Sequence, residues 1–428
     1  MENVFINPGK EQWSALIKRP AFDFNTLENI VLPILQDVKI NGDIAIKKYT
    51  AQFDAVQPAD LKVTSSEIKS AVAVVGEELK NAIDQAIKNI TKFHVAQIEG
   101  VVKIETTPGV VCWRKPVAIE SVGLYIPGGT APLFSTLLML AIPAQIAGCS
   151  NIIVCTPCDK NGNVHAAVLY TAHILGLQNI YKIGGAQAIA AMAYGSESVQ
   201  KVNKIFGPGN QFVTAAKQLV SREGIAIDMP AGPSEVAVYA DETAVPAFVA
   251  ADLLSQAEHG PDSQVVLVAT TRNIIDEVKH QVQMQLKDLP RKNIAEKALA
   301  NSRWIVMEDA ENAFDFLNIY AAEHFIIASE NAESLAEKVI NAGSVFLGNY
   351  SPESAGDYAS GTNHTLPTNG YAKAYSGVSV DSFVKKITFQ QLSKEGLNNI
   401  GKAVETMAAA EGLDAHKNAI SLRLNFKV

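Results

Sequence analysis

Short β-branched runs alternate with helical stretches through most of this chain, and the alternation limits the possible folds more than any other feature. Gly, Pro or Asn residues that favour turns flank each run. This pattern is typical of α/β proteins, in which helices cover the faces of parallel sheets, and it predicts two Rossmann-like parallel-sheet domains. We expect one series of strands at residues 152–154, 180–183, 204–206 and 226–227, and a second at 236–238, 265–268, 304–306, 325–327 and 344–346.

Apolar residues return to helical spacing before and after the alternating region, which adds two smaller pieces to the expected architecture. A chain of 428 residues also exceeds the usual length of one domain. We therefore expect four parts: an N-terminal helical segment (1–100), a first α/β domain (101–234), a second α/β domain (235–384) and a small helical C-terminal domain (385–428).

The composition favours a globular protein that acts on small molecules. Hydrophobic residues make up 48% of the chain, the net charge is -8 and the pI is near 5.6. An acidic chain without a basic face is not expected to bind nucleic acid or a membrane surface. The first residues lack a signal-peptide pattern, and no apolar stretch is long enough to cross a bilayer, so we expect a cytoplasmic protein.

Four cysteines are too few to hold a chain of this size together by disulfides. Cys155 and Cys158 form a C-x-x-C motif after an expected strand, which is compatible with a redox pair or with half of a zinc site. Because no second C-x-x-C exists, structural thiols are the default interpretation. The role of this pair stays open.

One helix end carries three groups that can bind a metal or move a proton, namely Gln256, Glu258 and His259. Gly260 and Pro261 supply the stop signal, so the three residues are expected in the last turn. Gln256 and His259 are i,i+3 neighbours on one helix face, whereas Glu258 points elsewhere. Gln256 and His259 are the natural metal pair, although a His that caps the helix dipole would give the same pattern.

Glycine-rich turns mark the strand ends of the first α/β unit. The turn 207–210 joins a strand to a helix, where backbone N–H groups bind phosphate, but it lacks the complete G-x-G-x-x-G fingerprint. A plain strand-to-helix connection is the alternative. Together, the turns 125–129, 184–187 and 207–210 suggest that the chain binds an adenine dinucleotide without the usual signature.

Further polar groups converge in the second unit and near the C-terminus. Glu323 and His324 lie between a helix and a strand, a placement suited to proton transfer. Residues 354–364 are expected to form a long loop that contains a carboxylate and a histidine, and Glu411 and His416 make another pair. Each of these signals is weak alone, because surface Glu and His residues are common.

Five segments resemble histidinol dehydrogenases, and together they are much more specific than any single pair. They are LLSQAEHGPDS at 253–263, GDYASGTNH at 356–364, AHKNA at 415–419, GLYIPGG at 123–129 and FGPGN at 206–210. The similarity runs in order from the N-terminal helices to about Arg423. It implies an enzyme of histidine biosynthesis that oxidises L-histidinol through L-histidinaldehyde to L-histidine with two NAD.

The resemblance also implies an intertwined homodimer with shared active sites and one zinc ion per subunit. By position, the zinc ligands fall on Gln256, His259, Asp357 and His416, the last of these reaching the site of the neighbouring subunit. Such a set of imidazole, carboxylate and amide donors leaves open positions that the substrate would complete.

The same resemblance assigns proton transfer to Glu323 and His324. The substrate-binding positions are Ser234, Gln256, His259, His324, Asp357, His364, Glu411 and His416, and the NAD contacts are Tyr125, Gln187 and Asn210. One departure is that Ala322 stands where the family usually has a proline. Alternatives are a relative that oxidises another small alcohol, a zinc hydrolase that needs no NAD, and a thiol or zinc-binding protein built on the C-x-x-C pair.

Overall fold

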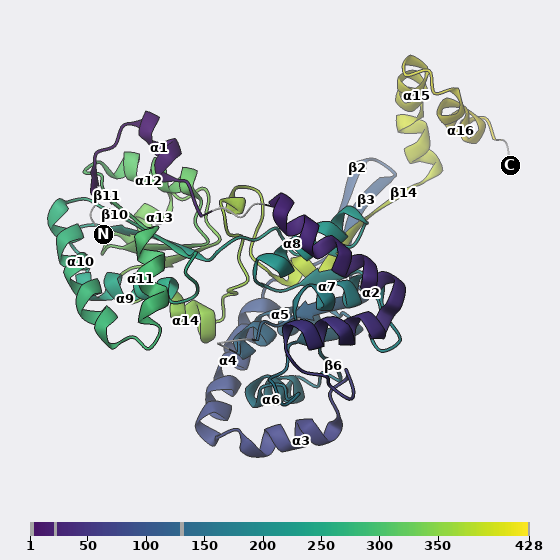
Figure 1. Ribbon diagram of the computed structural model, residues 1–428. Coiled ribbons are helices and arrows are strands. Elements are labelled where there is room, and N and C mark those ends of the chain that lie inside the picture. The colour runs from purple at the N-terminus through teal and green to yellow at the C-terminus, as the bar shows by residue number, and fades with distance from the viewer. Residues whose placement is uncertain (1–3, 21–23, 129–131, 427–428) are drawn as a thin grey trace.

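The computed structural model describes residues 4–20, 24–128 and 132–426, which form two parallel sheets, their covering helices and a projecting arm (Figure 1). The first sheet has the strand order β6-β5-β4-β7-β8, with all neighbours parallel. Its strands are β4 (Ser121–Tyr125), β5 (Asn151–Thr156), β6 (Asn179–Lys182), β7 (Lys204–Phe206) and β8 (Ala226–Ile227).

Helices from two parts of the chain cover the first sheet. Those that connect its strands are α5 (Phe134–Ala147), α6 (Ala166–Ile174), α7 (Gly185–Tyr194) and α8 (Gln211–Arg222). Those from the N-terminal part are α2 (Phe24–Phe53), α3 (Ser65–Val74) and α4 (Glu77–Val95). Helix α2 packs against α7 and α8, α3 against α6, and α4 against α5. The N-terminal helices thus complete the core of the first unit.

The second sheet has the order β1-β11-β10-β9-β12-β13 and is also parallel throughout. Its strands are β1 (Val4–Ile6), β9 (Glu235–Ala240), β10 (Gln264–Ala269), β11 (Arg303–Val306), β12 (His324–Ala328) and β13 (Ser344–Leu347). The accompanying helices are α1 (Lys10–Leu16), α9 (Pro246–Ala257), α10 (Arg272–Gln285), α11 (Lys292–Ala300), α12 (Ala310–Tyr320), α13 (Ala332–Ala336) and α14 (Glu353–Tyr358). Short 3₁₀ turns are η1 (Leu286–Asp288), η2 (Tyr371–Lys373) and η3 (Val380–Phe383).

The prediction of a mixed α/β fold with parallel sheets is confirmed, and all nine strands expected from the sequence are present. Strand β1 differs from the expected helical N-terminal segment, since it extends the second sheet by pairing with β11. Its place in the sheet depends on pairing with a strand that is distant in the sequence, which local apolar spacing cannot reveal. Behind it, Trp13 and Leu16 of α1 pack into the second core, so the start of the chain belongs to this unit.

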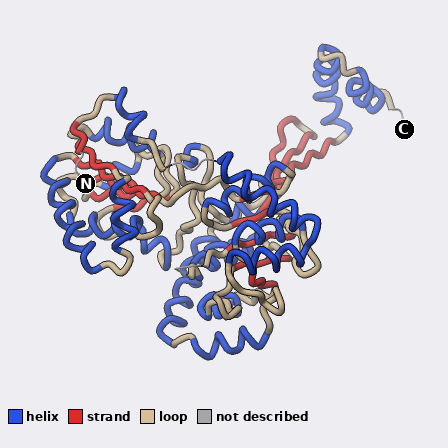
Figure 2. The backbone as a smooth tube through the Cα atoms, viewed as in Figure 1, coloured by secondary structure: helices blue, strands red, loops and turns tan. Residues whose placement is uncertain are grey.

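A projecting arm begins with an antiparallel sheet of β2 (Lys103–Thr107), β3 (Val110–Ala118) and β14 (Val384–Leu392). It ends in the helices α15 (Lys394–Ala410) and α16 (Asp414–Leu424), which pack on each other and lie away from both sheets (Figures 1 and 2). The two helices confirm the helical spacing seen in the sequence, whereas β14 was not expected. Most residues of β14 are exposed, so no run of buried apolar residues marks this strand in the sequence. No described helix has the length and apolarity needed to span a membrane.

Candidate functional site

The amino-terminal edge of the second sheet brings together the predicted acid and base. Glu323 immediately precedes β12, and His324 is its first residue, opposite Val236 of β9. The backbone N–H of Glu235 donates to Glu323 Oε2 at 3.0 Å, which fixes the carboxylate across the strand pair. Ser234 precedes β9 at the same edge, where its carbonyl accepts from the N–H of Gln264 at 3.2 Å.

Helix α9 delivers Gln256 to this edge. The helix ends at Ala257, so His259 lies two residues beyond it and not in the last turn as the sequence suggested. The stop signal acts earlier than expected, but the N–H of His259 still donates to the Gln256 carbonyl at 3.3 Å and keeps both residues in one turn. Gln256 is fully buried, whereas His259 is exposed.

Hydrogen-bond partners fix the orientation of the Gln256 amide. Its Nε2 donates to Glu353 Oε1 at 3.2 Å, and its Oε1 accepts from the backbone N–H of Glu235 at 3.3 Å. A carbonyl oxygen has two lone pairs, so one remains on Oε1 for a cation.

Helix α14 supplies two carboxylates to the site. The sequence predicted a loop here, but residues 353–358 are helical and the loop begins only at Ala359. Glu353 and Asp357 are separated by one helical turn and therefore share a face. His324 lies between them, with Nε2 3.5 Å from Asp357 Oδ1 and Nδ1 4.0 Å from Glu353 Oε2. Its Nδ1 is also 3.8 Å from Glu323 Oε2.

Burial and mutual attraction shape the protonation of this cluster. Burial raises the pKa of Glu323 to about 8 and that of Glu353 to about 7. Burial opposes charge on His324, but Glu323, Glu353 and Asp357 together raise its pKa to about 10. His324 in turn keeps the pKa of Asp357 below its ordinary value despite burial. Groups coupled in this way exchange protons as a unit.

Three polar atoms in this cluster have no hydrogen-bond partner within the described chain. They are both ring nitrogens of His324 and Oδ1 of Asp357, and all three are buried. Buried polar atoms are nearly always paired, so this set marks a place where a ligand is expected. His259, whose pKa the surrounding protein lowers to about 4, carries a neutral imidazole near neutral pH. That form is the one that binds metals.

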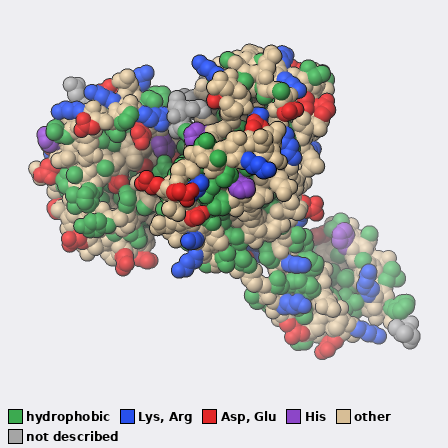
Figure 3. Space-filling model, turned by 90° about the horizontal axis from the view of Figure 1, so that it is seen from below, with side chains coloured by type: hydrophobic (Ala, Val, Ile, Leu, Met, Phe, Trp, Pro, Cys, Tyr) green, Lys and Arg blue, Asp and Glu red, His purple; other side chains and the backbone are tan. Residues whose placement is uncertain are grey.

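The segment after α14 connects this edge to the first unit. Asn89 Nδ2 donates to the carbonyl of Ala359 at 2.7 Å, and Asn363 Nδ2 donates to that of Met139 at 2.6 Å. His364 Nε2 lies 3.5 Å from Thr136 Oγ1 at the start of α5. His364 also perturbs the pKa of His259 and Asp357, so the site lies between the two units. Figure 3 shows a hollow between the two lobes with histidine side chains beside it.

The predicted cofactor residues lie at the carboxyl edge of the first sheet. Tyr125 ends β4, and Asn210 caps α8 directly after β7; the chain reverses its strand order between these two neighbours. Open α/β sheets bind ligands at this kind of switch point. The Tyr125 hydroxyl accepts from the N–H of Gly185 at 3.1 Å, which joins the edge to the start of α7. Gln187 in α7 is fully buried, and both of its amide atoms have no partner among the described residues.

A buried ion pair holds the turn before Asn210, which the sequence did not reveal. Lys217 and Asp228 are paired and almost fully buried. Lys217 Nζ donates to the Gly207 carbonyl at 2.9 Å, and Asp228 Oδ2 accepts from the Gly207 N–H at 2.8 Å. Gly207 has φ 123°, and a β-carbon there would overlap the Tyr125 carbonyl oxygen, so only glycine fits. Gly129, the last residue of the predicted turn 125–129, lies outside the described residues.

The structure does not bring Glu411 and His416 to the other predicted residues of the same chain. Both are exposed on the arm, at the end of α15 and in α16. Accordingly, no group of three or more His, Cys, Asp or Glu side chains within the described parts of the chain could hold a metal ion. Cys155 and Cys158 are free thiols, and burial raises the pKa of both. Raised pKa values favour inert structural thiols.

Comparisons with known proteins agree over almost the entire chain. The family model for histidinol dehydrogenase matches residues 17–424. The histidinol dehydrogenase of Bacteroides thetaiotaomicron is 60% identical over 99% of both chains, and that of Salmonella typhimurium is 52% identical over 97% of this chain and 95% of its own. The chain belongs to the histidinol dehydrogenase family. It is therefore an oxidoreductase.

A solved structure supports the same conclusion at the level of the fold. The crystal structure of histidinol dehydrogenase from Elizabethkingia anophelis is 58% identical, has a TM-score of 0.96, and covers 98% of this chain and 97% of its own.

For this histidinol dehydrogenase family member, sequence reasoning missed Glu353. A signal was present, since Glu353 precedes Asp357 by four residues, but no motif included it. It also missed Glu235, whose carboxylate forms a buried ion pair with Arg19. The departure at Ala322 leaves the turn intact, because its carbonyl accepts from the Gly343 N–H at 2.9 Å.

Proposed function

We propose that the chain oxidises L-histidinol through L-histidinaldehyde to L-histidine, with two NAD as oxidant and one zinc ion in each site. The observation that carries the proposal is the convergence of Gln256 and Asp357 with the Glu323 and His324 pair at one sheet edge. This edge of the second sheet faces the first unit, whose sheet has the switch point at which NAD is proposed to bind.

The donor atoms at this edge fit a zinc ion. Asp357 Oδ1 is buried without a partner, Gln256 Oε1 retains a lone pair, and His259 is neutral. When bound, the ion would anchor polar atoms of the substrate and stabilise developing negative charge. His416 of the partner subunit is proposed as the fourth protein ligand.

Proton transfer is proposed for the acid and base at the start of β12. His324 in its neutral form accepts the proton of the substrate alcohol in the first oxidation, because its ring nitrogens are unpaired and a hydroxyl group would satisfy one of them. A zinc ion bound beside Asp357 would favour that neutral form, since its positive charge opposes the three carboxylates that otherwise raise the pKa of the ring. Glu323, held by the Glu235 N–H, accepts a proton from the water that adds to the aldehyde. The resulting hydrate is the substrate of the second oxidation.

The remaining substrate contacts are proposed from the hollow and from the arm. In this chain they are Ser234, directly before β9, and His364, whose Nε2 lies 3.5 Å from Thr136 Oγ1 of α5. Glu411 of the partner subunit is proposed to pair with a cationic or hydroxyl group of histidinol.

NAD fits the carboxyl edge of the first sheet. Buried Gln187 has an amide without partners, and Gly207 keeps its turn free of a side chain. The Oδ1 of Asn210 is occupied in capping α8, so contact with a cofactor falls to its Nδ2. When bound, NAD would accept the hydride in both oxidations.

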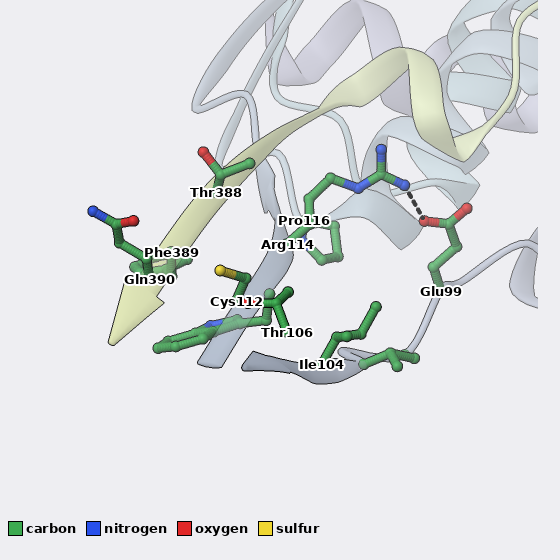
Figure 4. A pocket seen from close by; sticks show the side chains of 12 residues that line it. Glu99, Ile104, Thr106, Cys112, Arg114, Pro116, Thr388, Phe389 and Gln390 are labelled. Carbon is green, nitrogen blue, oxygen red and sulfur yellow. Dashed lines mark ion pairs between the residues drawn. The ribbon is translucent and has the colours of Figure 1, made fainter. Parts of the chain in front are cut away.

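A homodimer would bring the arm of one subunit to the hollow between the two lobes of the other. The arm exposes apolar side chains, with Val102 70% and Met407 65% exposed. Its antiparallel sheet also lines a separate pocket of about 950 Å³ (Figure 4). Trp113 and Phe389, which both line this pocket, stack on each other. Exposed apolar surface of this extent is typical of protein interfaces. A second copy of the chain is the proposed occupant, because it would also supply Glu411 and His416.

The stoichiometry of the reaction tests this function. Zinc-loaded protein is mixed with limiting L-histidinol and excess NAD, and NADH is followed by its absorbance. We expect two NADH for each histidinol. One NADH would contradict the second oxidation, and no NADH would contradict the dehydrogenase. Parallel reactions with other small alcohols and with ester or amide substrates would then identify a different alcohol substrate or a zinc hydrolase.

A further inference from the structure

Glu353 is a buried acid for which the proposed chemistry has no use. Its side chain is only 1% exposed, and it lies at the start of α14, away from the arm. Burying a carboxylate costs free energy unless charged or polar partners compensate. If this position only filled space, an uncharged side chain would do so at a lower cost in free energy. The partners of Glu353 therefore indicate its role.

The first partners of Glu353 lie at the end of α9. Ser255 Oγ donates to Glu353 Oε1 at 2.8 Å, and Gln256 Nε2 donates to the same oxygen at 3.2 Å. A carboxylate that accepts from Nε2 directs the other end of the amide, Oε1, toward Glu235 and the open side of the site. Such a contact also increases the negative charge on Oε1, which strengthens it as a metal ligand.

The third partner of Glu353 is the base. His324 Nδ1 lies 4.0 Å from Glu353 Oε2, while its other nitrogen faces Asp357. Phe346 stacks against the ring with centroids 5.9 Å apart, so the imidazole is supported on one face while its two nitrogens face carboxylates. One carboxylate thus contacts a proposed metal ligand and faces the proposed base.

We infer that Glu353 is a positioning residue that orients the Gln256 amide toward the metal and the His324 ring toward the substrate. It touches neither substrate nor metal itself. The inference rests on the proposed zinc-dependent function. It explains why the acid is retained in a buried position and why α14 carries two carboxylates one turn apart.

The test compares the parent enzyme with Glu353→Gln, which keeps the shape and removes the charge. Zinc affinity is measured by competition with a chromogenic chelator, independently of turnover. We expect zinc affinity to fall about 10- to 100-fold. At saturating zinc and histidinol, kcat should fall about tenfold while the KM for NAD stays unchanged, since the cofactor edge lies in the other unit.

Glu258→Gln is the matched control, because it removes a carboxylate from the same turn as Gln256 without touching Glu353. Its zinc affinity should equal that of the parent. The melting temperature of the metal-free proteins separates positioning from folding. A purely structural Glu353 would lower that temperature in Glu353→Gln and leave zinc affinity within a factor of two of the parent, which would overturn the inference.

If Glu353→Gln does not fold, Ser255→Ala removes one donor to Glu353 and leaves the acid in place. We then expect about a threefold loss of zinc affinity, which matches the loss of one hydrogen bond. No loss in this variant would overturn the inference. A parent enzyme that binds no zinc would instead contradict the proposed function, so the two failures can be told apart.

Discussion

The two parallel sheets present their proposed functional residues at opposite ends of their strands. In the first unit, Tyr125 is the last residue of β4, and Asn210 follows the carboxyl end of β7. In the second unit, Ser234, Glu323 and His324 lie at the amino ends of β9 and β12. The first edge offers uncharged groups and a glycine turn, whereas the second offers ionisable groups that helices α9 and α14 enclose.

This difference teaches how one architecture serves two tasks. The carboxyl edge of a parallel sheet offers backbone groups in open turns, which suits the cofactor binding proposed there. The packed amino edge holds side chains in a buried environment that alters their pKa, which suits the proton transfer proposed there. The comparison predicts that substitutions at the amino edge of the second sheet lower kcat, whereas substitutions at the carboxyl edge of the first sheet raise the KM for NAD.

The largest expected effect is at the amino edge of the second sheet. His324→Asn should lower kcat by about 10³-fold, because it removes the group proposed to accept the alcohol proton. Zinc content, measured by atomic emission, should stay close to one per subunit. Loss of zinc in this variant would contradict the division between base and metal ligands.

A second large effect is expected from His416 on the arm, which lies apart from the other proposed site residues of its own chain. His416→Asn should lose most of its zinc on dialysis and most of its activity, and excess zinc should restore part of the activity. Circular dichroism should remain that of the parent, since His416 is exposed. Full zinc retention would show that the arm does not complete the metal site.

A smaller effect is expected at the carboxyl edge of the first sheet. Asp228→Asn weakens the buried pair with Lys217 and loosens the Gly207 turn, so we expect the KM for NAD to rise about tenfold. The KM for histidinol and the zinc content should not change. An equal rise in both KM values would mean that the two edges are not independent.

The smallest functional effect is expected from the C-x-x-C pair. Replacing Cys155 and Cys158 together by serine should leave zinc content and kcat unchanged. The melting temperature should fall slightly, because a hydroxyl at the fully buried position 155 lacks the partners it has in water. A fall in zinc content would revive the alternative that these thiols bind metal.

Most of the architecture could be predicted because apolar periodicity marks buried strands and helices independently of their partners. The strands from β5 to β13 follow this rule. Strand β1 did not, since its place depends on pairing with the distant β11. Strand β14 was missed because most of its residues are exposed and no run of buried apolar residues marks it.

The candidate site was predictable only in part from local spacing. The separation of Gln256 and His259 indicated a pair, but it did not show that α9 ends at Ala257, before His259. Glu353, Lys217 and Asp228 escaped notice because their roles come from contacts between distant segments. The family resemblance supplied Asp357 and His416, which no spacing rule links to the α9 turn.

Co-expression of His324→Asn and His416→Asn subunits tests most directly whether each active site draws on two chains. In the mixed dimer, one site would carry both substitutions and the other would carry neither. Differently tagged subunits allow the mixed dimer to be purified, and its NADH production is then measured with zinc, histidinol and NAD. The account predicts about half of the parent activity per dimer, although each pure variant is nearly inactive. Activity no higher than that of the pure variants would contradict the shared site.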